Sequence, residues 1–174
     1  AVASSAATAE EAPAVESAFP NEKNDVMVIA PVSGTVVSQK ELSDPAFAAG
    51  ALGTGVGVVP TTGTVVAPVS GRIISVAKTG HAYGIKTDDG MEILVHVGVD
   101  TVKMKGAGFT PKVEKKQFVD VGHPLAEVDF EAVKAAGYDP TVIVTVVNSK
   151  SLESVTEASS GTVQTGEPVL SVKM

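Results

Sequence analysis

The chain has 174 residues, of which 44% are hydrophobic, and a formal net charge of −7 from 20 acidic and 13 basic side chains. This size suits one domain with a substantial core, and the acidic balance argues against a nucleic-acid partner, whose phosphates require clustered lysine and arginine. Cysteine is absent, which excludes disulfides, thiolate nucleophiles and cysteine-ligated zinc.

The first 22 residues are rich in Ala, Glu, Ser and Pro and contain few large apolar side chains. Such sequence cannot bury enough surface to offset its ordering entropy. Residues 1–22 are therefore predicted to form a flexible linker or tail, and residues 23–174 the domain. Because the chain begins at Ala1 within linker-like sequence, we interpret it as the carboxyl-terminal domain of a longer protein, with a processed start as the alternative.

From Asp25 onward, short valine-rich runs with alternating apolar residues are separated by glycine-containing turns, a pattern typical of many short strands. Two brief helices are expected, at residues 44–50 and 129–137, the second with Asp129 as N-cap and Gly137 as its left-handed terminal residue. No apolar run is long enough to cross a bilayer and no signal peptide is recognisable. We expect a soluble, cytoplasmic chain.

Two pairs of segments repeat along the chain. Residues 30–36 (APVSGTV) match residues 67–73 (APVSGRI), and a Val-x-x-Gly-x-Pro pattern begins at both Val119 and Val163. Each unit is typical of two strands joined by a tight glycine turn. The repeats therefore predict an all-β fold, an antiparallel β-sandwich or flattened barrel with pseudo-symmetric hairpins and one or two very short helices.

The strongest candidate for a functional group is His96. Between residues 91 and 100 the aliphatic residues at odd positions alternate with the others. Side chains of a strand point alternately to its two faces, so His96 is predicted on the face opposite the aliphatic one.

A second histidine is predicted to lie beside it. The dipeptide Asp89-Gly90 favours a two-residue hairpin turn, which would set Tyr83 opposite His96 and His81 opposite Gly98. The two histidines would then be diagonal neighbours on one exposed face, about 7–8 Å apart at the backbone. A turn longer or shorter by one residue would put them on opposite faces.

Two imidazoles on one exposed face suit phosphoryl carriage. A neutral imidazole is nucleophilic near neutral pH, and a second one can donate a hydrogen bond or supply charge to the transferred anion. The competing interpretation is that both are ordinary half-buried polar residues. His123 is left out of the site because it occupies the same turn position as Glu167 in the repeat, as expected of an exposed loop residue.

Residues 90–102 (GMEILVHVGVDTV) resemble the active-site signature of the glucose-type enzyme IIA of the bacterial sugar phosphotransferase system. Residues 79–83 (TGHAY) resemble its second histidine motif, and the likeness extends from about Val26 to Met174. The resemblance implies that His96 accepts phosphate at its ε nitrogen from phospho-HPr and passes it to a cysteine of the enzyme IIB domain. It also implies that His81 hydrogen-bonds the phosphoryl group and that Thr79 orients His81.

The resemblance further implies how partners dock. Asp44 and Asp100 match acidic positions that face a basic donor surface, although an N-cap and a solvated strand end explain them equally well. Leu94 and Tyr83 are expected in an apolar docking ring around the histidines. For Phe47, ordinary core packing is the preferred interpretation.

The same resemblance implies no cofactor and no metal. Membrane contact is expected only through a fused or partner IIC domain, which would tether the chain to the inner face of the membrane. The IIB domain is expected in the same polypeptide. Residues 133–139 (VKAAGYD) are more similar to the sucrose and β-glucoside branch than to the free glucose protein.

Two other classes remain as alternatives. A zinc-dependent peptidase would explain a histidine-bearing barrel, but it normally needs a third protein ligand and a His-x-His pair, and the strand here reads His96-Val97-Gly98. A biotinyl or lipoyl carrier would explain the repeated hairpins. Its Met-Lys-Met motif is approached only by Lys103-Met104-Lys105, in which the order is inverted.

Overall fold

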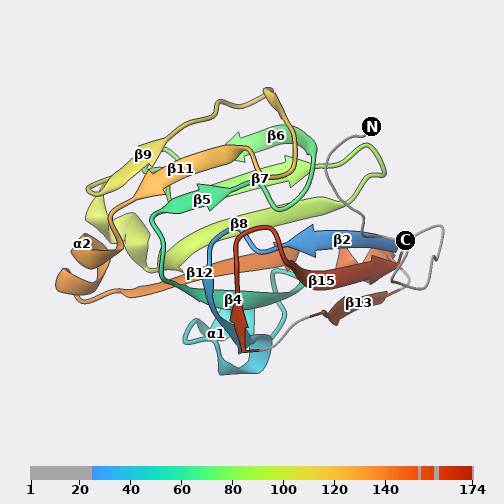
Figure 1. The fold of residues 1–174 in the computed structure, drawn as a ribbon, viewed down its shortest axis with the longest axis horizontal. Coiled ribbons are helices and arrows are strands. Elements are labelled where there is room, and N and C mark those ends of the chain that lie inside the picture. Colours follow the sequence, from blue (N-terminus) through green and yellow to red (C-terminus); the bar gives the residue numbers. More distant parts are fainter. Residues whose placement is uncertain (1–24, 153, 159–160, 174) are drawn as a thin grey trace.

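The computed structural model describes residues 25–152, 154–158 and 161–173. In these residues the chain forms one eight-stranded sheet and two three-stranded sheets, with short helices at the periphery (Figure 1). This confirms the predicted all-β architecture. The predicted linker, residues 1–22, lies outside the described residues.

Every strand pairing in these sheets is antiparallel. The large sheet runs in the order β10 (Phe118–Val119), β6 (Gly71–Val76), β7 (Ala82–Lys86), β8 (Glu92–Val99), β12 (Asp139–Val146), β4 (Thr54–Pro60), β3 (Gly34–Ser38) and β14 (Thr162–Val163). One small sheet contains β5 (Thr64–Val66), β11 (Pro124–Val128) and β9 (Phe109–Pro111). The other contains β13 (Ser154–Glu157), β15 (Pro168–Lys173) and β2 (Asp25–Ile29).

The two halves of the repeated sequence make equivalent hydrogen bonds. Hydrogen bonds of the first repeat recur at the corresponding positions of the second. They are Ala30 N to Glu167 O (2.7 Å) with Ala67 N to His123 O (2.8 Å), and Thr165 N to Ser33 Oγ (2.8 Å) with Val121 N to Ser70 Oγ (2.8 Å). The strand order is correspondingly palindromic, since β10-β6-β7-β8 mirrors β14-β3-β4-β12. The fold therefore has the internal pseudo-symmetry that the sequence indicates.

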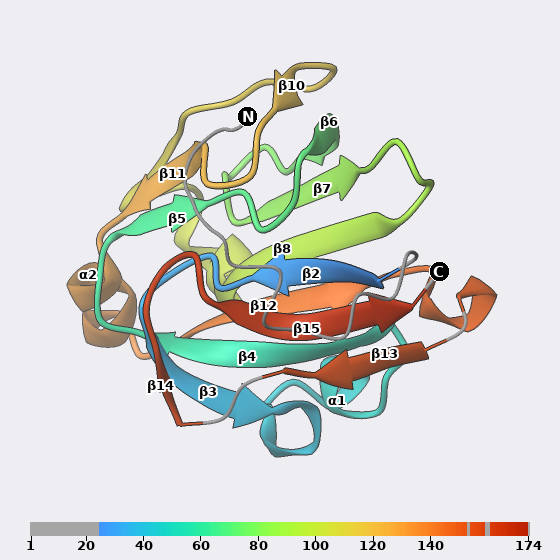
Figure 2. The same ribbon diagram turned by 45° about the vertical axis from the view of Figure 1, so that its right-hand side comes forward.

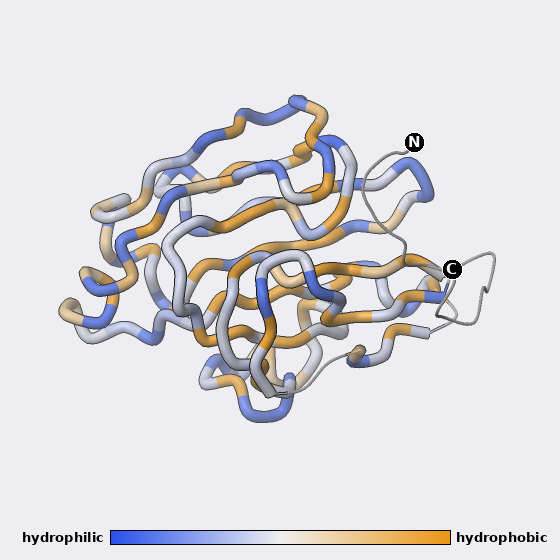
Figure 3. The backbone as a smooth tube through the Cα atoms, in the orientation of Figure 1, coloured by the Kyte–Doolittle hydropathy of each residue, from blue (hydrophilic) through white to orange (hydrophobic). Residues whose placement is uncertain are grey.

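The main core lies between the large sheet and the two small ones. Its buried side chains come from all three sheets and are dominated by valine. The view in Figure 2 shows the large sheet continuing from β10 to β3, with β5 and β11 over one half and β2 and β15 over the other. Hydrophobic colour is concentrated on these inner strands, while the peripheral turns are mostly hydrophilic (Figure 3).

Two short α-helices form where their capping residues predict them. α1 (Pro45–Ala48) begins after Asp44, whose carboxylate accepts from Ala46 N at 2.8 Å. α2 (Phe130–Ala135) begins after Asp129, which accepts from Ala132 N at 3.1 Å. Three 3-10 turns complete the described helical elements: η3 (Gln39–Glu41), η4 (Thr101–Met104) and η5 (Ser149–Ser151). None of the described helices has the length and apolar character needed to span a membrane.

The predicted register of the hairpin between β7 and β8 is wrong by one residue. Tyr83 lies opposite Val95, and Ala82 lies opposite His96. The turn has three residues rather than two, because Thr87 N bonds Met91 O and Gly90 takes a positive φ of 91°. A three-residue loop ending in a left-handed glycine fits the strand twist as well as a two-residue turn does, so the Asp-Gly dipeptide alone does not determine the register.

Candidate functional site

His96 projects from β8 on the face of the large sheet opposite the main core. Its neighbours Val95 and Val97 are fully buried in that core, so strand alternation turns the imidazole outward. Ile143 of β12 lies directly opposite His96 and is also fully buried, within a separate outer-face cluster. This cluster consists of Leu42, Phe47, Val99 and Ile143, with Val37, Ala48 and Leu94 packed at its edge.

The backbone at Gly98, where the pairing of β8 with β12 is irregular, fixes the hydrogen bonding of the His96 ring. Gly98 has a φ of 78°, a conformation that side-chain-bearing residues rarely adopt. Its carbonyl oxygen lies 2.7 Å from Nδ1 of His96. A carbonyl can only accept, so Nδ1 carries the proton and Nε2 of the neutral ring keeps its lone pair. The available nucleophile is therefore Nε2.

His81 is the residue immediately before β7, and its ring lies beside that of His96. Its carbonyl accepts from Val97 N at 2.6 Å, and its ring centroid lies 5.2 Å from that of His96, with the ring planes at 79°. Nδ1 of His81 is 2.5 Å from the hydroxyl of Thr79. The structure thus brings together the three residues that the sequence predicts at the centre of the site.

Both imidazoles are biased toward their neutral form. Burial lowers the pKa of His96 from its usual 6.5, and the Gly98 carbonyl, Asp44 and Asp100 oppose that shift only in part. Burial, followed by the proximity of His96, lowers the pKa of His81. At neutral pH a lone pair is therefore available on Nε2 of His96.

Phe47 forms one wall of the site. Its ring centroid lies 5.1 Å from that of His96 with the planes at 60°, an edge-to-face contact. It is 2% exposed and belongs to the outer-face cluster, as the packing interpretation predicts. Leu94, a predicted docking residue, is half-buried at the margin of this cluster and remains partly accessible.

The two predicted acidic residues occupy the structural positions that the sequence allows, and both lie near His96. Asp44 caps α1, and Asp100 ends β8 in a left-handed conformation with a φ of 63°. Each also lies close enough to His96 to raise its pKa slightly against the effect of burial. Negative charge from two different segments of the chain therefore acts on His96.

The prediction that Tyr83 belongs to a docking ring is wrong. Its side chain has no exposed surface and packs in the main core, on the face opposite His96. Burial raises the pKa of its hydroxyl to about 12. The error follows from the hairpin register, because the longer turn moves Tyr83 from the outer face to the inner one.

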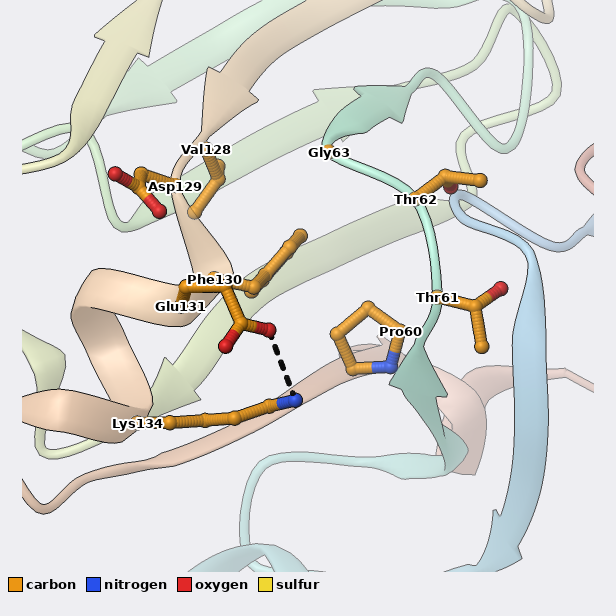
Figure 4. Close-up of a pocket in the computed structure, with 9 residues that line it drawn as sticks. All are labelled: Pro60, Thr61, Thr62, Gly63, Val128, Asp129, Phe130, Glu131 and Lys134. Atoms are coloured by element: carbon orange, nitrogen blue, oxygen red, sulfur yellow. Dashed lines mark hydrogen bonds and ion pairs between the residues drawn. The ribbon is translucent and has the colours of Figure 1, made fainter.

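Two other features lie outside the histidine pair. His123 is exposed in the turn before β11, where only its main chain bonds to Ala67. A cavity of about 340 Å³ lies beside α2 and includes neither His81 nor His96 (Figure 4). Two of the charged groups that line this cavity, Lys134 and Glu131, form an ion pair with each other at 3.3 Å.

The contact of the Gly98 carbonyl with His96 was not predicted from the sequence. Its signal was present, because a glycine inside an otherwise regular strand often marks a bulge. The direction of a carbonyl cannot be read from composition, so its role required the structure.

Neither alternative class finds support in the site. In the part of the chain that the structure describes, no three His, Cys, Asp or Glu side chains are arranged to hold a metal ion. Lys103 and Met104 lie in the 3-10 turn η4, with Met104 packed against the main core, whereas a carrier lysine would have to stand at an exposed hairpin tip.

An all-β sandwich with two imidazoles in contact, one of which has a free Nε2, fits the class of histidine-dependent transferases. Comparison with known proteins is more specific. A sequence model of the EIIA 1 family of the phosphoenolpyruvate-dependent sugar phosphotransferase system matches residues 26–152, and the chain belongs to this family.

Individual relatives agree with this assignment. The glucose-specific EIIA component of Bacillus cereus is 38% identical over 135 residues, which cover 78% of this chain and 82% of the relative. The β-glucoside-specific EIIBCA component of Bacillus subtilis is 40% identical over 154 residues, which cover 87% of this chain and 25% of the relative. The solved glucose permease IIA of Mycoplasma capricolum superposes with a TM-score of 0.75 at 35% identity, covering 84% of this chain and 95% of that one.

The chain spans about a quarter of the length of the β-glucoside-specific EIIBCA relatives that it matches, 23% of the one from Dickeya chrysanthemi and 25% of the one from Bacillus subtilis. Those relatives carry the EIIA part together with EIIB and EIIC parts, as their names state.

Proposed function

We propose that this domain carries a phosphoryl group on Nε2 of His96, between phospho-HPr and the cysteine of an enzyme IIB domain. The observation that carries the proposal is the hydrogen bond from Nδ1 of His96 to the Gly98 carbonyl. It leaves Nε2 as the free nucleophile next to a second imidazole.

In the first step the lone pair on Nε2 attacks phosphorus. The nitrogen–phosphorus bond of the donor phosphohistidine breaks as a new one forms to His96, and the donor imidazole leaves with its electron pair. Nδ1 keeps its proton, so the phosphorylated ring bears positive charge. The Gly98 carbonyl, Asp44 and Asp100 favour a positively charged His96 ring, and they would stabilise this intermediate.

In the second step a thiolate attacks phosphorus. The bond to Nε2 breaks, its electron pair returns to the nitrogen, and the ring leaves as a neutral imidazole that is still protonated on Nδ1. A transition state of this kind spreads negative charge over the phosphoryl oxygens. Donors fixed beside those oxygens therefore accelerate transfer.

His81 is proposed as that donor, with Thr79 orienting it. When the hydroxyl of Thr79 donates to Nδ1 of His81, the proton of the neutral ring resides on Nε2 and can bond a phosphoryl oxygen. The contact between Thr79 and His81 supports this assignment. The same contact gives Nδ1 of His81 a different partner from Nδ1 of His96, so the two rings take different roles in the proposal.

The partners follow from the family and from the charge around the site. Asp44 and Asp100 would face the basic surface of HPr, and Leu94 would contribute apolar contact at the rim. The EIIBCA names of several relatives support an enzyme IIB and a IIC domain as partners in the same polypeptide, which would hold this domain at the cytoplasmic face of the membrane.

The proposal is tested by incubating the chain with phosphoenolpyruvate, enzyme I and HPr. One acid-labile phosphoryl group per chain is expected, and His96→Ala should abolish it. His123→Ala is the matched control, since it removes an exposed histidine outside the site and should leave labelling unchanged. Acid-stable labelling of serine or threonine, or loss of labelling in folded His123→Ala, would contradict the proposal.

A further inference from the structure

Residues 39–53, here called the Phe47 arch, cross the outer face of the large sheet between β3 and β4. The arch contains η3 and α1 and brings Phe47 against His96. Its apolar side chains Leu42 and Phe47 belong to the outer-face cluster. An interaction that holds the arch in place therefore also holds the Phe47 ring, one wall of the site, in place.

The side chain of Gln39 ties the two ends of the arch together. Nε2 of Gln39 donates to the carbonyl of Phe47 at 2.9 Å and to the carbonyl of Gly53 at 2.7 Å. Oε1 accepts from Gly55 N at 3.4 Å. Both carbonyls can only accept, so the amide orientation is fixed by its partners and both of its N–H groups are used.

A second link holds the middle of the arch. Ser43 donates to the carboxylate of Asp139 at 2.7 Å, and Asp139 is itself bonded by Thr141. This link anchors the residue before Asp44 to strand β12. It does not bond Phe47 directly; the carbonyl of Phe47 accepts from Gln39, and its N–H donates to the Asp44 carboxylate at 3.3 Å.

We propose that Gln39 is a positioning residue, which holds the Phe47 ring against His96 and so keeps the acceptor imidazole in the desolvated geometry that phosphoryl transfer uses. The inference rests on the proposed function for its kinetic part. Gln39 is four residues or more from every other site residue in sequence and touches neither histidine; it acts through the Phe47 main chain.

The environment of His96 provides a readout that stability alone would not change. The Phe47 ring excludes water from one side of His96, and burial is the main reason why the pKa of His96 is low. The charged or titratable groups that also influence the ring are His81, Asp44 and Asp100. If the arch loosens, the pKa of His96 should rise toward its usual 6.5.

The test compares Gln39→Met, which keeps the side-chain length without its hydrogen bonds, with Gln39→Asn, which keeps an uncharged amide but is one methylene shorter. Gln117→Met is the matched control, because Gln117 is also half-buried and bonds one main-chain amide, far from the histidines in the turn before β10. Imidazole NMR titration measures the pKa of His96 in the whole chain, and rapid-quench assays measure phosphate acceptance from phospho-HPr.

Both Gln39 variants are expected to raise the pKa of His96 and to slow acceptance by roughly 10- to 100-fold, since small displacements of a reacting group have effects of that order. Gln117→Met should match the wild type in both. In a Phe47→Ala background, Gln39→Met should add nothing further, because the effect passes through Phe47.

Folded Gln39 variants with an unchanged His96 pKa and unchanged acceptance would overturn the inference, as would a full additional effect in the Phe47→Ala background. If Gln39→Met does not fold, Gln39→Asn and the Phe47→Ala background carry the test. Failure of the wild-type chain to accept phosphate would instead contradict the proposed function, and the pKa measurement would still decide the role of Gln39.

Discussion

His96 and His81 differ in what bonds their Nδ1 atoms. Nδ1 of His96 faces the Gly98 carbonyl, which can only accept, whereas Nδ1 of His81 faces the Thr79 hydroxyl, which can donate or accept. The tautomer of His96 is therefore fixed, while His81 can be a neutral Nε2–H donor or a cation. This difference separates a nucleophile from a group that adjusts to the transferred phosphate.

His81→Gln should separate the two transfer steps. Glutamine keeps a donor but cannot become cationic, so phosphate acceptance on His96 should persist while delivery to the IIB cysteine slows by ~10²–10³. Rapid-quench kinetics of each half-reaction measures the split. His123→Gln provides the control for loss of a histidine elsewhere, and equal delivery rates for His81→Gln and the wild type would rule out this role.

The residue types of the site were predictable from sequence, but their geometry only in part. The proximity of His81 and His96 was predicted from a register that proved wrong. It holds because His81 lies outside β7, where strand alternation does not fix its side chain. Tyr83 lies inside β7, where strand alternation fixes the direction of its side chain. The one-residue error in the register therefore led to the prediction of an outward-facing Tyr83, whereas its side chain lies in the core.

At the scale of the strand, the end of β8 is shaped by one glycine. The pairing with β12 shifts between Val97 and Val99, and Gly98 lies in that irregularity with its carbonyl directed at His96. A Cβ at Gly98 would lie 2.4 Å from the buried methyl of Thr101. Thr101 is held in turn by its hydroxyl bond to the Val97 carbonyl.

Gly98→Ala is therefore expected to destabilise the protein more than Gly122→Ala does. Both glycines have positive φ, 78° and 88°, but nothing lies within 4 Å of a Cβ at Gly122. The left-handed conformation alone costs alanine about 1–2 kcal/mol, and Gly98→Ala adds the contact with Thr101. Urea denaturation gives both free energies of unfolding, and equal losses would show that the backbone at Gly98 accommodates a side chain.

The hairpin between β7 and β8 shows which sequence signal determines the register of two paired strands. The Asp89-Gly90 dipeptide indicated the turn correctly, but three residues form it. The register follows instead from burial, because Tyr83 and Ile85 must face the same core as Ile93 and Val95. Comparison of the apolar patterns of both strands would have identified this register.

For the whole molecule, the repeated motifs predicted the sandwich and its pseudo-symmetry, which paired hydrogen bonds of the two halves confirm. The course of the large sheet was not predictable, since β8 and β12 are neighbours although the 39 residues 100–138 separate them in the chain. Such long-range pairing leaves no local pattern in the chain. The candidate site lies at this central, non-local junction, because His96 pairs with Ile143 there.

The lowered pKa values of the histidine pair should make stability depend on pH. In the unfolded chain both histidines take up protons near pH 6.5, whereas the folded protein resists doing so. The free energy of unfolding should therefore be highest above that value and fall as the pH drops from 8 to 5.

Urea denaturation at pH 8 and pH 5 measures this dependence, and His81→Gln/His96→Gln should show a smaller fall than the wild type. Asp139 also has a lowered pKa: partial burial opposes it, but hydrogen bonds from Thr141 and Ser43 outweigh that effect. Its contribution is lost only as the pH falls below the usual 3.8, outside this window. An identical fall in the double variant would show that the pair does not control it.

The central claim is that His96 carries phosphate on Nε2 because Nδ1 is already bound to the Gly98 carbonyl. Phosphorus and imidazole NMR of the phosphorylated chain tests it most directly, since the two ring positions give different couplings and shifts. One phosphohistidine is expected, at Nε2 of His96, with the proton retained on Nδ1. Phosphate on Nδ1 of His96, or on His81, would contradict it.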